Sequence, residues 1–205
     1  MKTVKTYIIL LLVLTSCYVD DESSFISDSF DPRMPQYSEE GANTAGAYIN
    51  NYPWVARKRI ISSIFSSRPN AVGTMSIFDS LATNGTFMAF QGGDIFINES
   101  SVNCSVGLFL GGINLSSQDD LFQLEGNVIE LDGDVSFGQL IFDNNFDSIN
   151  YDQVGVGTLY IRRVERVDSH VELSGTFGFS IISDEEHSVF SGRFDYKVYP
   201  EQFRD

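Results

Sequence analysis

Short apolar runs with a period of two dominate the chain from about residue 44 to its end. Apolar and polar side chains alternate within each run, and Gly, Asn and Asp separate one run from the next. Such alternation places successive side chains on opposite faces of a β-strand. Because no long helical period lies between the runs, we expect an all-β domain over residues 44–205, an antiparallel β-sandwich or partly open barrel of roughly ten strands.

The pattern predicts both the strands and one helix. Strands are expected at 73–78, 86–90, 95–98, 104–110, 121–124, 128–131, 138–142, 157–165, 170–183 and 188–199. Residues 58–65 differ, because Ile60, Ile61 and Ile64 recur at helical spacing and predict one short helix.

Two hairpins are predicted near the ends of the domain. Residues 47–49 and 54–56 flank Asn50-Asn51-Tyr52-Pro53, which predicts a turn at the two asparagines. The runs 170–183 and 188–199 are long enough to pair across residues 184–186. We expect the pair to share an inner face, formed by Leu173, Phe177, Phe179, Ile181, Phe190 and Phe194.

The chain before residue 44 carries a different pattern. Residues 17–43 are polar and acidic, contain Pro32 and Pro35, and scatter their few apolar side chains. This composition predicts an acidic, flexible tether.

Residues 1–16 have the order of a secretory signal peptide. Lys2 and Lys5 form a positive start, residues 7–14 are apolar, and Leu14-Thr15-Ser16-Cys17 resembles the lipobox of bacterial lipoproteins. We therefore expect the thiol of Cys17 to carry a covalent lipid, with palmitate among its chains, and to anchor the mature protein in a membrane. A transmembrane helix is disfavoured because the apolar run is far shorter than the roughly 20 residues required. An ordinary cleaved signal has no need for this cysteine.

Asp20, Asp21 and Glu22 follow Cys17 closely and look like the signal that sends lipoproteins of Bacteroidota to the outer face of the outer membrane. A solvated acidic linker is the alternative. The expected location is thus the outer membrane, with exposure at the cell surface or in the periplasm left open.

The charge of the chain excludes one class of partner. The net charge is −15, and loss of Lys2 and Lys5 leaves 11 basic against 28 acidic side chains in the mature chain, a net charge of −17. Nucleic acid is not expected, because its binding requires clustered Lys and Arg. An acidic surface does attract divalent cations.

Cys104 is the only cysteine that remains after lipidation, so no intramolecular disulfide is expected. It alternates with Val102, Val106 and Leu108, which favours a buried position on the inner face of a strand over an exposed reactive thiol.

Three stretches resemble an uncharacterised family of Bacteroidota lipoproteins that carries a domain of unknown function. They are residues 46–56, residues 157–161 together with 173–179, and residues 191–195. Asn51 stands where the family often has a glycine, and asparagine also tolerates a left-handed turn. The resemblance implies an all-β lipoprotein of the envelope and assigns no catalytic residues.

Candidate catalytic and metal sites are sparse. The only histidines are His170 and His187, each at the start of a predicted strand, where we expect surface positions, and no Gly-x-Ser-x-Gly motif occurs. Two histidines and one core cysteine do not make a zinc cluster. Calcium is the more plausible ion, with Asp119, Asp120, Asp132 and Asp134 as loop ligands, although Asp and Gly are also what turns require.

Binding and modification sites are the remaining candidates. Trp54 lies beside a turn, where its ring either stacks on a sugar or covers the core, and the core is favoured. Residues 79–81 and 147–149, both Asp-Ser followed by Leu or Ile, resemble an acceptor motif for O-glycosylation in Bacteroidota. We expect a membrane-anchored, non-enzymatic module that binds a glycan or an envelope protein, or has a structural role. A hydrolase that acts on glycan or lipid through paired carboxylates is the alternative.

Overall fold

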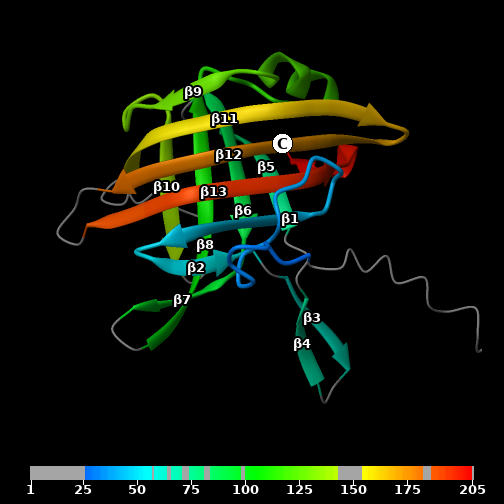
Figure 1. Cartoon of the computed structure of the whole chain (residues 1–205). Helices are drawn as coiled ribbons and strands as arrows, with labels where there is room; N and C mark the ends of the chain where they lie inside the picture. The colour runs from blue at the N-terminus through cyan, green and yellow to red at the C-terminus, as the bar shows by residue number, and fades with distance from the viewer. Residues whose placement is uncertain are drawn as a thin grey trace, which may run out of the picture.

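A computed structural model describes residues 26–56, 58–63, 66–70, 74–80, 84–97, 100–142, 154–181 and 186–204. The all-β prediction is confirmed: one large, curled sheet of 12 strands accounts for most of the described chain (Figure 1). Ten strands follow one another in the order β14-β5-β6-β8-β10-β11-β12-β13-β1-β2, while β7 pairs with β8 and β9 pairs with β11. Every pairing is antiparallel except β14 with β5.

The strands have the following bounds. In the first half they are β1 (Thr44–Ile49), β2 (Tyr52–Val55), β3 (Lys58–Ser63), β4 (Ser66–Asn70), β5 (Thr74–Ser80), β6 (Gly85–Gln91), β7 (Asp94–Ile97) and β8 (Ser100–Gly111). In the second half they are β9 (Val128–Leu131), β10 (Phe137–Phe142), β11 (Val154–Val167), β12 (His170–Ile181), β13 (His187–Val198) and β14 (Phe203–Arg204). The 3-10 helices are η1 (Gln118–Leu124) and η3 (Pro200–Gln202).

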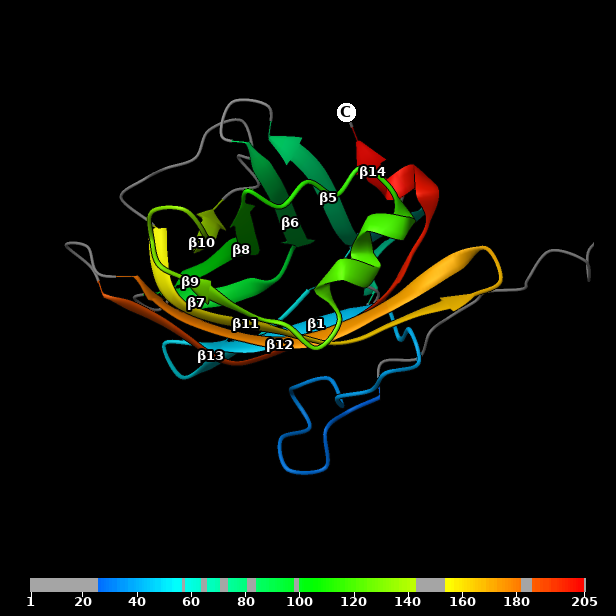
Figure 2. The same ribbon diagram turned by 90° about the horizontal axis from the view of Figure 1, so that it is seen from above.

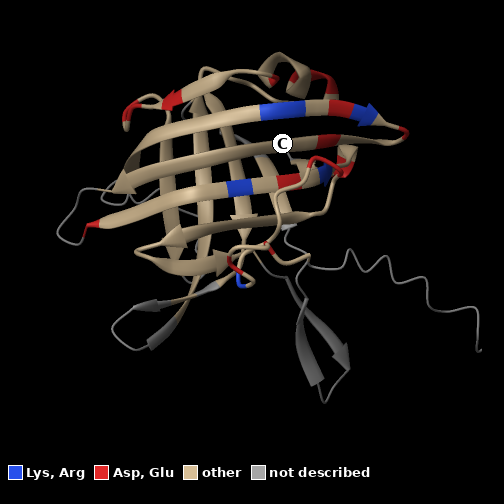
Figure 3. Cartoon of the chain, in the orientation of Figure 1, with Lys and Arg blue, Asp and Glu red and all other residues tan. Residues whose placement is uncertain are grey.

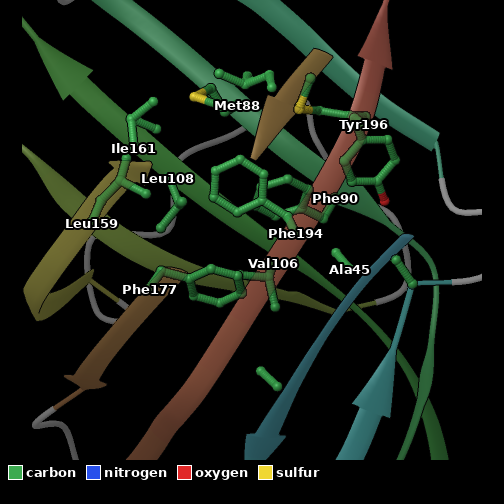
Figure 4. Packing of buried hydrophobic residues seen from close by; sticks show 14 of the residues in the cluster. Ala45, Met88, Phe90, Val106, Leu108, Leu159, Ile161, Phe177, Phe194 and Tyr196 are labelled. Atoms are coloured by element: carbon green, nitrogen blue, oxygen red, sulfur yellow. The ribbon is translucent and has the colours of Figure 1, made fainter. Parts of the chain in front are cut away.

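The sheet curls so that its two halves face each other across the core. Seen from above, β11, β12 and β13 form one wall and β5, β6 and β8 the opposite wall (Figure 2). Phe90 on β6 spans the gap, with ring centroids 5.6 Å from Phe177 on β12 and 5.1 Å from Phe194 on β13 (Figure 4). These rings alternate along their strands with outward residues, so the period of two in the sequence determines which side chains form the core.

The predicted first hairpin is present as β1 and β2. Asn50 and Asn51 form its turn with φ of 50° and 70°, the left-handed region that asparagine tolerates better than most residues. Trp54 on β2 is fully buried, and its indole Nε1 donates a hydrogen bond to the carbonyl oxygen of Cys104 at 2.9 Å. Trp54 therefore covers the core, and its ring is not available to stack on a sugar.

Two predictions of local structure were wrong. Residues 58–63 form strand β3 rather than a helix, which agrees with their β-branched isoleucines. Residues 121–124, expected as a strand, belong to helix η1. Ser117 precedes this helix, and the Asp120 carboxylate accepts hydrogen bonds from the backbone N–H groups of Ser116 and Ser117, both at 2.9 Å. These bonds favour a helix start over an extended strand.

Residues 26–43, which we call the strap, correct the prediction of a flexible tether over 17–43. The strap lies on the outer face of β13 and β1 (Figure 2). Met34 within it is fully buried, and Ser27 forms a β-bridge with Pro35. The sequence concealed this docking because the strap is held by polar bonds to the sheet, not by an amphipathic face. Residues 1–25 lie outside the described chain. Within the described part, no helix combines the length and hydropathy needed to cross a membrane.

Candidate functional site

A β-bulge in β13 changes the outer face of the sheet. The pairing of β12 with β13 loses its register between Phe177 and Phe179, and Phe190 and Ser191 both become exposed. Ser191 has a φ of 52°, a left-handed conformation that is uncommon for serine. The prediction that Phe190 faces the core was therefore wrong, because the extra residue turns its ring outward. Phe194 keeps its predicted place in the core.

Beside this bulge the outer face contains a hollow of about 480 Å³. Aromatic rings border it, from Tyr37, Tyr160 and Phe190. Hydroxyl groups and one guanidinium also line it, from Thr158, Thr176, Ser191 and Arg193. The volume lies within the range of about 300–1,000 Å³ that is usual for small-molecule sites.

Gly178 explains why the face is hollow at this point. Thr158 pairs with Gly178 across β11 and β12, and Tyr160 pairs with Thr176 one step along the same face. Neighbouring outward side chains in such pairs stand about 5 Å apart and normally fill the surface. Because Gly178 has no side chain, a depression remains between Thr158 and Phe190.

The hollow lies where the outer face is uncharged. Strand β11 contains no Asp, Glu, Lys or Arg from Val154 to Ile161, and its charges begin at Arg162. Figure 3 shows most charges of β11 and β13 gathered toward one end of these strands. The opposite half contains none within either strand, and Glu186 directly precedes β13. Arg193 lies at the border between the two halves. This setting suits an uncharged ligand with polar groups better than an ion.

The strap supplies one wall of the hollow. Tyr37 belongs to the strap, and the guanidinium of Arg162 on β11 lies 5.6 Å from the centroid of its ring. Burial raises the pKa of the Tyr37 hydroxyl, so the group stays neutral at physiological pH. The hollow is thus complete only while the strap is docked on the sheet.

Strap and sheet are joined by two groups of β13. Asp195, almost fully buried, accepts hydrogen bonds from the backbone N–H groups of Glu40, Gly41 and Ala42 at 3.2, 2.9 and 3.0 Å. Arg193 donates from Nη1 to the Asp28 carboxylate at 2.8 Å. A buried carboxylate that receives several N–H donors is a strong anchor for a backbone.

The ring of Phe190 is supported from behind. Tyr48 on β1 stacks on it with a centroid distance of 5.3 Å and an interplanar angle of 15°. The Tyr48 hydroxyl donates to Asp31 of the strap at 2.7 Å, and Asp31 also accepts two bonds from the guanidinium of Arg33. Because Asp31 is held in this way, the Tyr48–Phe190 pair has a fixed position at the rim of the hollow.

Asp119, Asp120 and Asp132, three of the four predicted calcium ligands, each have another partner in the protein. Asp119 pairs with Arg166, and Asp120 caps η1. Asp132 accepts hydrogen bonds from the N–H groups of Asp134, Val135 and Ser136 at 2.8–2.9 Å, which lowers its pKa. Among the described residues no three His, Cys, Asp or Glu side chains stand together to hold a metal ion. Calcium binding stays a prediction with no cluster to support it.

The two histidines do not share a site. His187 pairs with Ile181 at one end of the β12–β13 hairpin, whereas His170 starts β12 at the other end. His187 is buried, contrary to the expected surface position, and its Nδ1 lies 2.7 Å from the Asn50 amide nitrogen. Cys104 is buried as predicted, and burial raises the pKa of its thiol to about 12.

Several predicted residues lie outside the described chain. These include Leu14, Thr15, Ser16 and Cys17 of the lipobox, the acidic residues 20–22 and the segment 147–149. Of the other candidate glycosylation segment, Asp79 and Ser80 end strand β5.

No protein-family model, curated protein or solved structure matches this chain. The hollow must therefore be interpreted from its own geometry. Sequence reasoning missed it because Tyr37, Thr158 and Phe190 come from three distant segments. The sequence signals that point to it are the uncharged halves of three neighbouring strands and the Phe190-Ser191 pair, which breaks the alternation of β13.

Proposed function

We propose that this protein is a lipid-anchored lipoprotein of the bacterial envelope whose outer-face hollow binds a neutral carbohydrate without catalysis. The observation that carries the proposal is the composition of the hollow: Tyr160 and Phe190 flank a floor at Gly178 that carries no side chain. Aromatic faces pack against the apolar C–H faces of sugar rings, while hydroxyl groups such as those of Thr158 and Thr176 exchange hydrogen bonds with sugar hydroxyls.

The residues that line the hollow favour binding over hydrolysis. A glycosidase requires two carboxyl groups on either side of the scissile bond. The hollow is lined by aromatic, hydroxyl, glycine and arginine residues and contains no carboxylate in its lining. The alternative of a carboxylate-dependent hydrolase therefore receives no support from this site.

Carbohydrate binding is tested with a panel of neutral oligosaccharides and the variant Gly178→Leu. A Cβ atom at Gly178 would lie 3.3 Å from the Val189 carbonyl oxygen and 3.8 Å from the Phe190 Cα, so the leucine enters the hollow and the Val189 carbonyl must shift by a few tenths of an ångström. Far-UV circular dichroism verifies that the sheet of the variant is intact. We expect the variant to lose at least tenfold in affinity. Val156→Leu, on the same face of β11 but outside the lining, is the matched control and should bind as the parent does. Equal binding by Gly178→Leu, or no binding to any neutral glycan, would contradict the proposal.

The anchor is tested separately. Metabolic labelling with a palmitate analogue should mark the parent protein and leave Cys17→Ala unlabelled, because the thiol of Cys17 is the proposed acceptor. Persistent label in Cys17→Ala would refute the assignment. The Bacteroidota origin and the outer-membrane location are parts of the same proposal, and surface proteolysis of intact cells distinguishes the outer face from the periplasm.

A further inference from the structure

Strands β3 and β4 form a two-stranded sheet of their own, separate from the large sheet. Figure 1 shows this hairpin extending away from the body of the molecule. Their antiparallel register pairs Lys58 with Asn70 and Ile60 with Arg68. A two-stranded hairpin is by itself only marginally stable in water, and in the described chain no third strand pairs with β3 or β4, so this hairpin is suited to a partner.

The charge of the hairpin is opposite to that of the rest of the chain. The 38 residues from 41 to 78 contain Arg57, Lys58, Arg59 and Arg68 and neither Asp nor Glu. The mature chain outside them holds seven basic against 28 acidic side chains. Such a local reversal within a strongly acidic protein indicates an interaction with an anionic partner.

The hairpin combines charge with apolar character. Lys58, Arg59, Ile60 and Ile61 follow one another in β3, and Arg68 lies in β4. Basic and apolar residues together are typical of segments that lie in the interface of an anionic membrane, where the apolar groups enter the headgroup region and the charges meet phosphate.

We propose that the β3–β4 hairpin docks on a membrane surface rich in anionic phospholipid headgroups. Charge complementarity is the main argument, since the remainder of the protein is repelled by such a surface and the hairpin alone is attracted to it. The inference uses the lipid anchor of the proposed function only as the reason that a membrane is close.

The test omits the anchor, so that its outcome is independent of lipidation. The full mature chain with Cys17→Ser is sedimented with vesicles of phosphatidylcholine alone and with vesicles of equal parts phosphatidylcholine and phosphatidylglycerol. We expect binding to the second kind only, and weaker binding as salt is added. Lys58→Gln together with Arg59→Gln should reduce the affinity on the order of 30-fold, about fivefold for each charge.

Two further variants make the result specific. Ile60→Ser with Ile61→Ser should weaken binding while leaving its salt dependence unchanged, because only the apolar contribution is removed. Arg33→Gln with Arg166→Gln removes two exposed charges elsewhere and should bind as the parent does. Far-UV circular dichroism and the fluorescence of Trp54 verify that the large sheet is intact in each variant.

Three results would overturn the inference. The first is no preference for phosphatidylglycerol, and the second is equal loss of binding in the Arg33 and Arg166 control. The third is a concentration-dependent dimer, seen by sedimentation velocity without vesicles, that Lys58→Gln with Arg59→Gln abolishes. That last result would assign the hairpin to an acidic surface on a second copy of the chain.

Discussion

Arg193 and Asp195 stand two residues apart on the outer face of β13 and hold the same strap through opposite charges. Arg193 binds the carboxylate of Asp28, and Asp195 receives three backbone N–H groups from residues 40–42. Both belong to residues 191–195, a stretch in which the sequence predicted a core position for Phe194 and no role for its neighbours. The two charged residues of that stretch, Arg193 and Asp195, fix the segment that completes the hollow.

Removal of the Asp195 carboxylate should release the strap. Asp195→Ala leaves three N–H groups and the Ser38 hydroxyl without their acceptor. We expect a loss of about 3 kcal/mol in the free energy of unfolding, measured by urea denaturation. Trypsin should also cut more rapidly after Arg33 in the variant. Asp119→Ala, which removes a carboxylate with a side chain 85% exposed, is the control and should cost under about 1 kcal/mol. An equal effect of the two substitutions would mean that Asp195 does not hold the strap on the sheet.

The left-handed backbone at Ser191 should discriminate between substitutions. With φ at 52°, Ser191→Gly relieves strain, whereas Ser191→Val introduces a β-branched side chain where it fits poorly. We expect the valine variant to unfold about 1–2 kcal/mol more easily than the glycine variant, as measured by thermal denaturation. Ser188→Gly and Ser188→Val, on the same strand before the bulge, provide the comparison. There the valine variant should be the more stable of the two.

The position of the Tyr48–Phe190 pair at the rim of the hollow, and with it the carbohydrate affinity, should depend on the hydroxyl of Tyr48. Tyr48→Phe keeps the stack on Phe190 and removes the hydrogen bond to Asp31. We expect carbohydrate affinity to fall about two- to tenfold by calorimetry, because the platform loses its fixed position while its apolar surface is retained. Tyr52→Phe, at an exposed position after the β1–β2 turn, should leave the affinity unchanged. A decrease of the same size in both variants would speak against a positioning role.

Acid should destabilise the protein below about pH 4. The N–H groups of Ser136, Asp134 and Val135 hold the pKa of Asp132 below its ordinary value, so near pH 4 and below the unfolded chain binds more protons than the folded chain. The contribution of the Asp132 carboxylate to stability is present above its pKa in the unfolded chain and is lost as the pH falls through its pKa in the folded chain. Asp132→Asn should therefore lower the Tm at pH 7 and differ less from the parent at pH 3. Asp134→Asn in the same turn should follow the parent at both pH values, since the N–H groups converge on Asp132.

The fluorescence emission of Trp54 should depend on the integrity of the core and should not change when a ligand binds. Trp54 is the only tryptophan and is fully buried, so its emission should be blue-shifted and protected from iodide. Trp54→Ala should cost about 3–5 kcal/mol, and Trp54→Phe about 1–2 kcal/mol through loss of the bond to the Cys104 carbonyl. Emission that shifts when a glycan binds, or that iodide quenches in the native state, would contradict the assignment of Trp54 to the core.

The sequence predicted well those features that depend on local alternation. The strands of the curled sheet, the turn at Asn50 and Asn51, and the burial of Cys104 and Trp54 all follow from neighbouring residues. What it did not predict depends on distant partners. The strap is held in place by the side chain of Asp195, about 150 residues away in the sequence. Phe190 faces outward because of the β-bulge in β13, and the alternation of apolar and polar residues does not predict a bulge. The strap and the bulge together form the hollow, so the alternation of apolar and polar residues in the sequence was not sufficient to predict it.

If Cys17 carries the proposed lipid, docking of the strap also limits how far the body of the protein can move from a bilayer. A free segment from Cys17 to Thr44 could span up to about 90 Å when fully extended, whereas the stretch from Cys17 to Ile26 can span at most about 30 Å. With the proposed lipid in place, the domain would meet only molecules that come within a few nanometres of the lipid surface. Release of the whole strap, from Arg193 and Tyr48 as well as from Asp195, would roughly triple that distance.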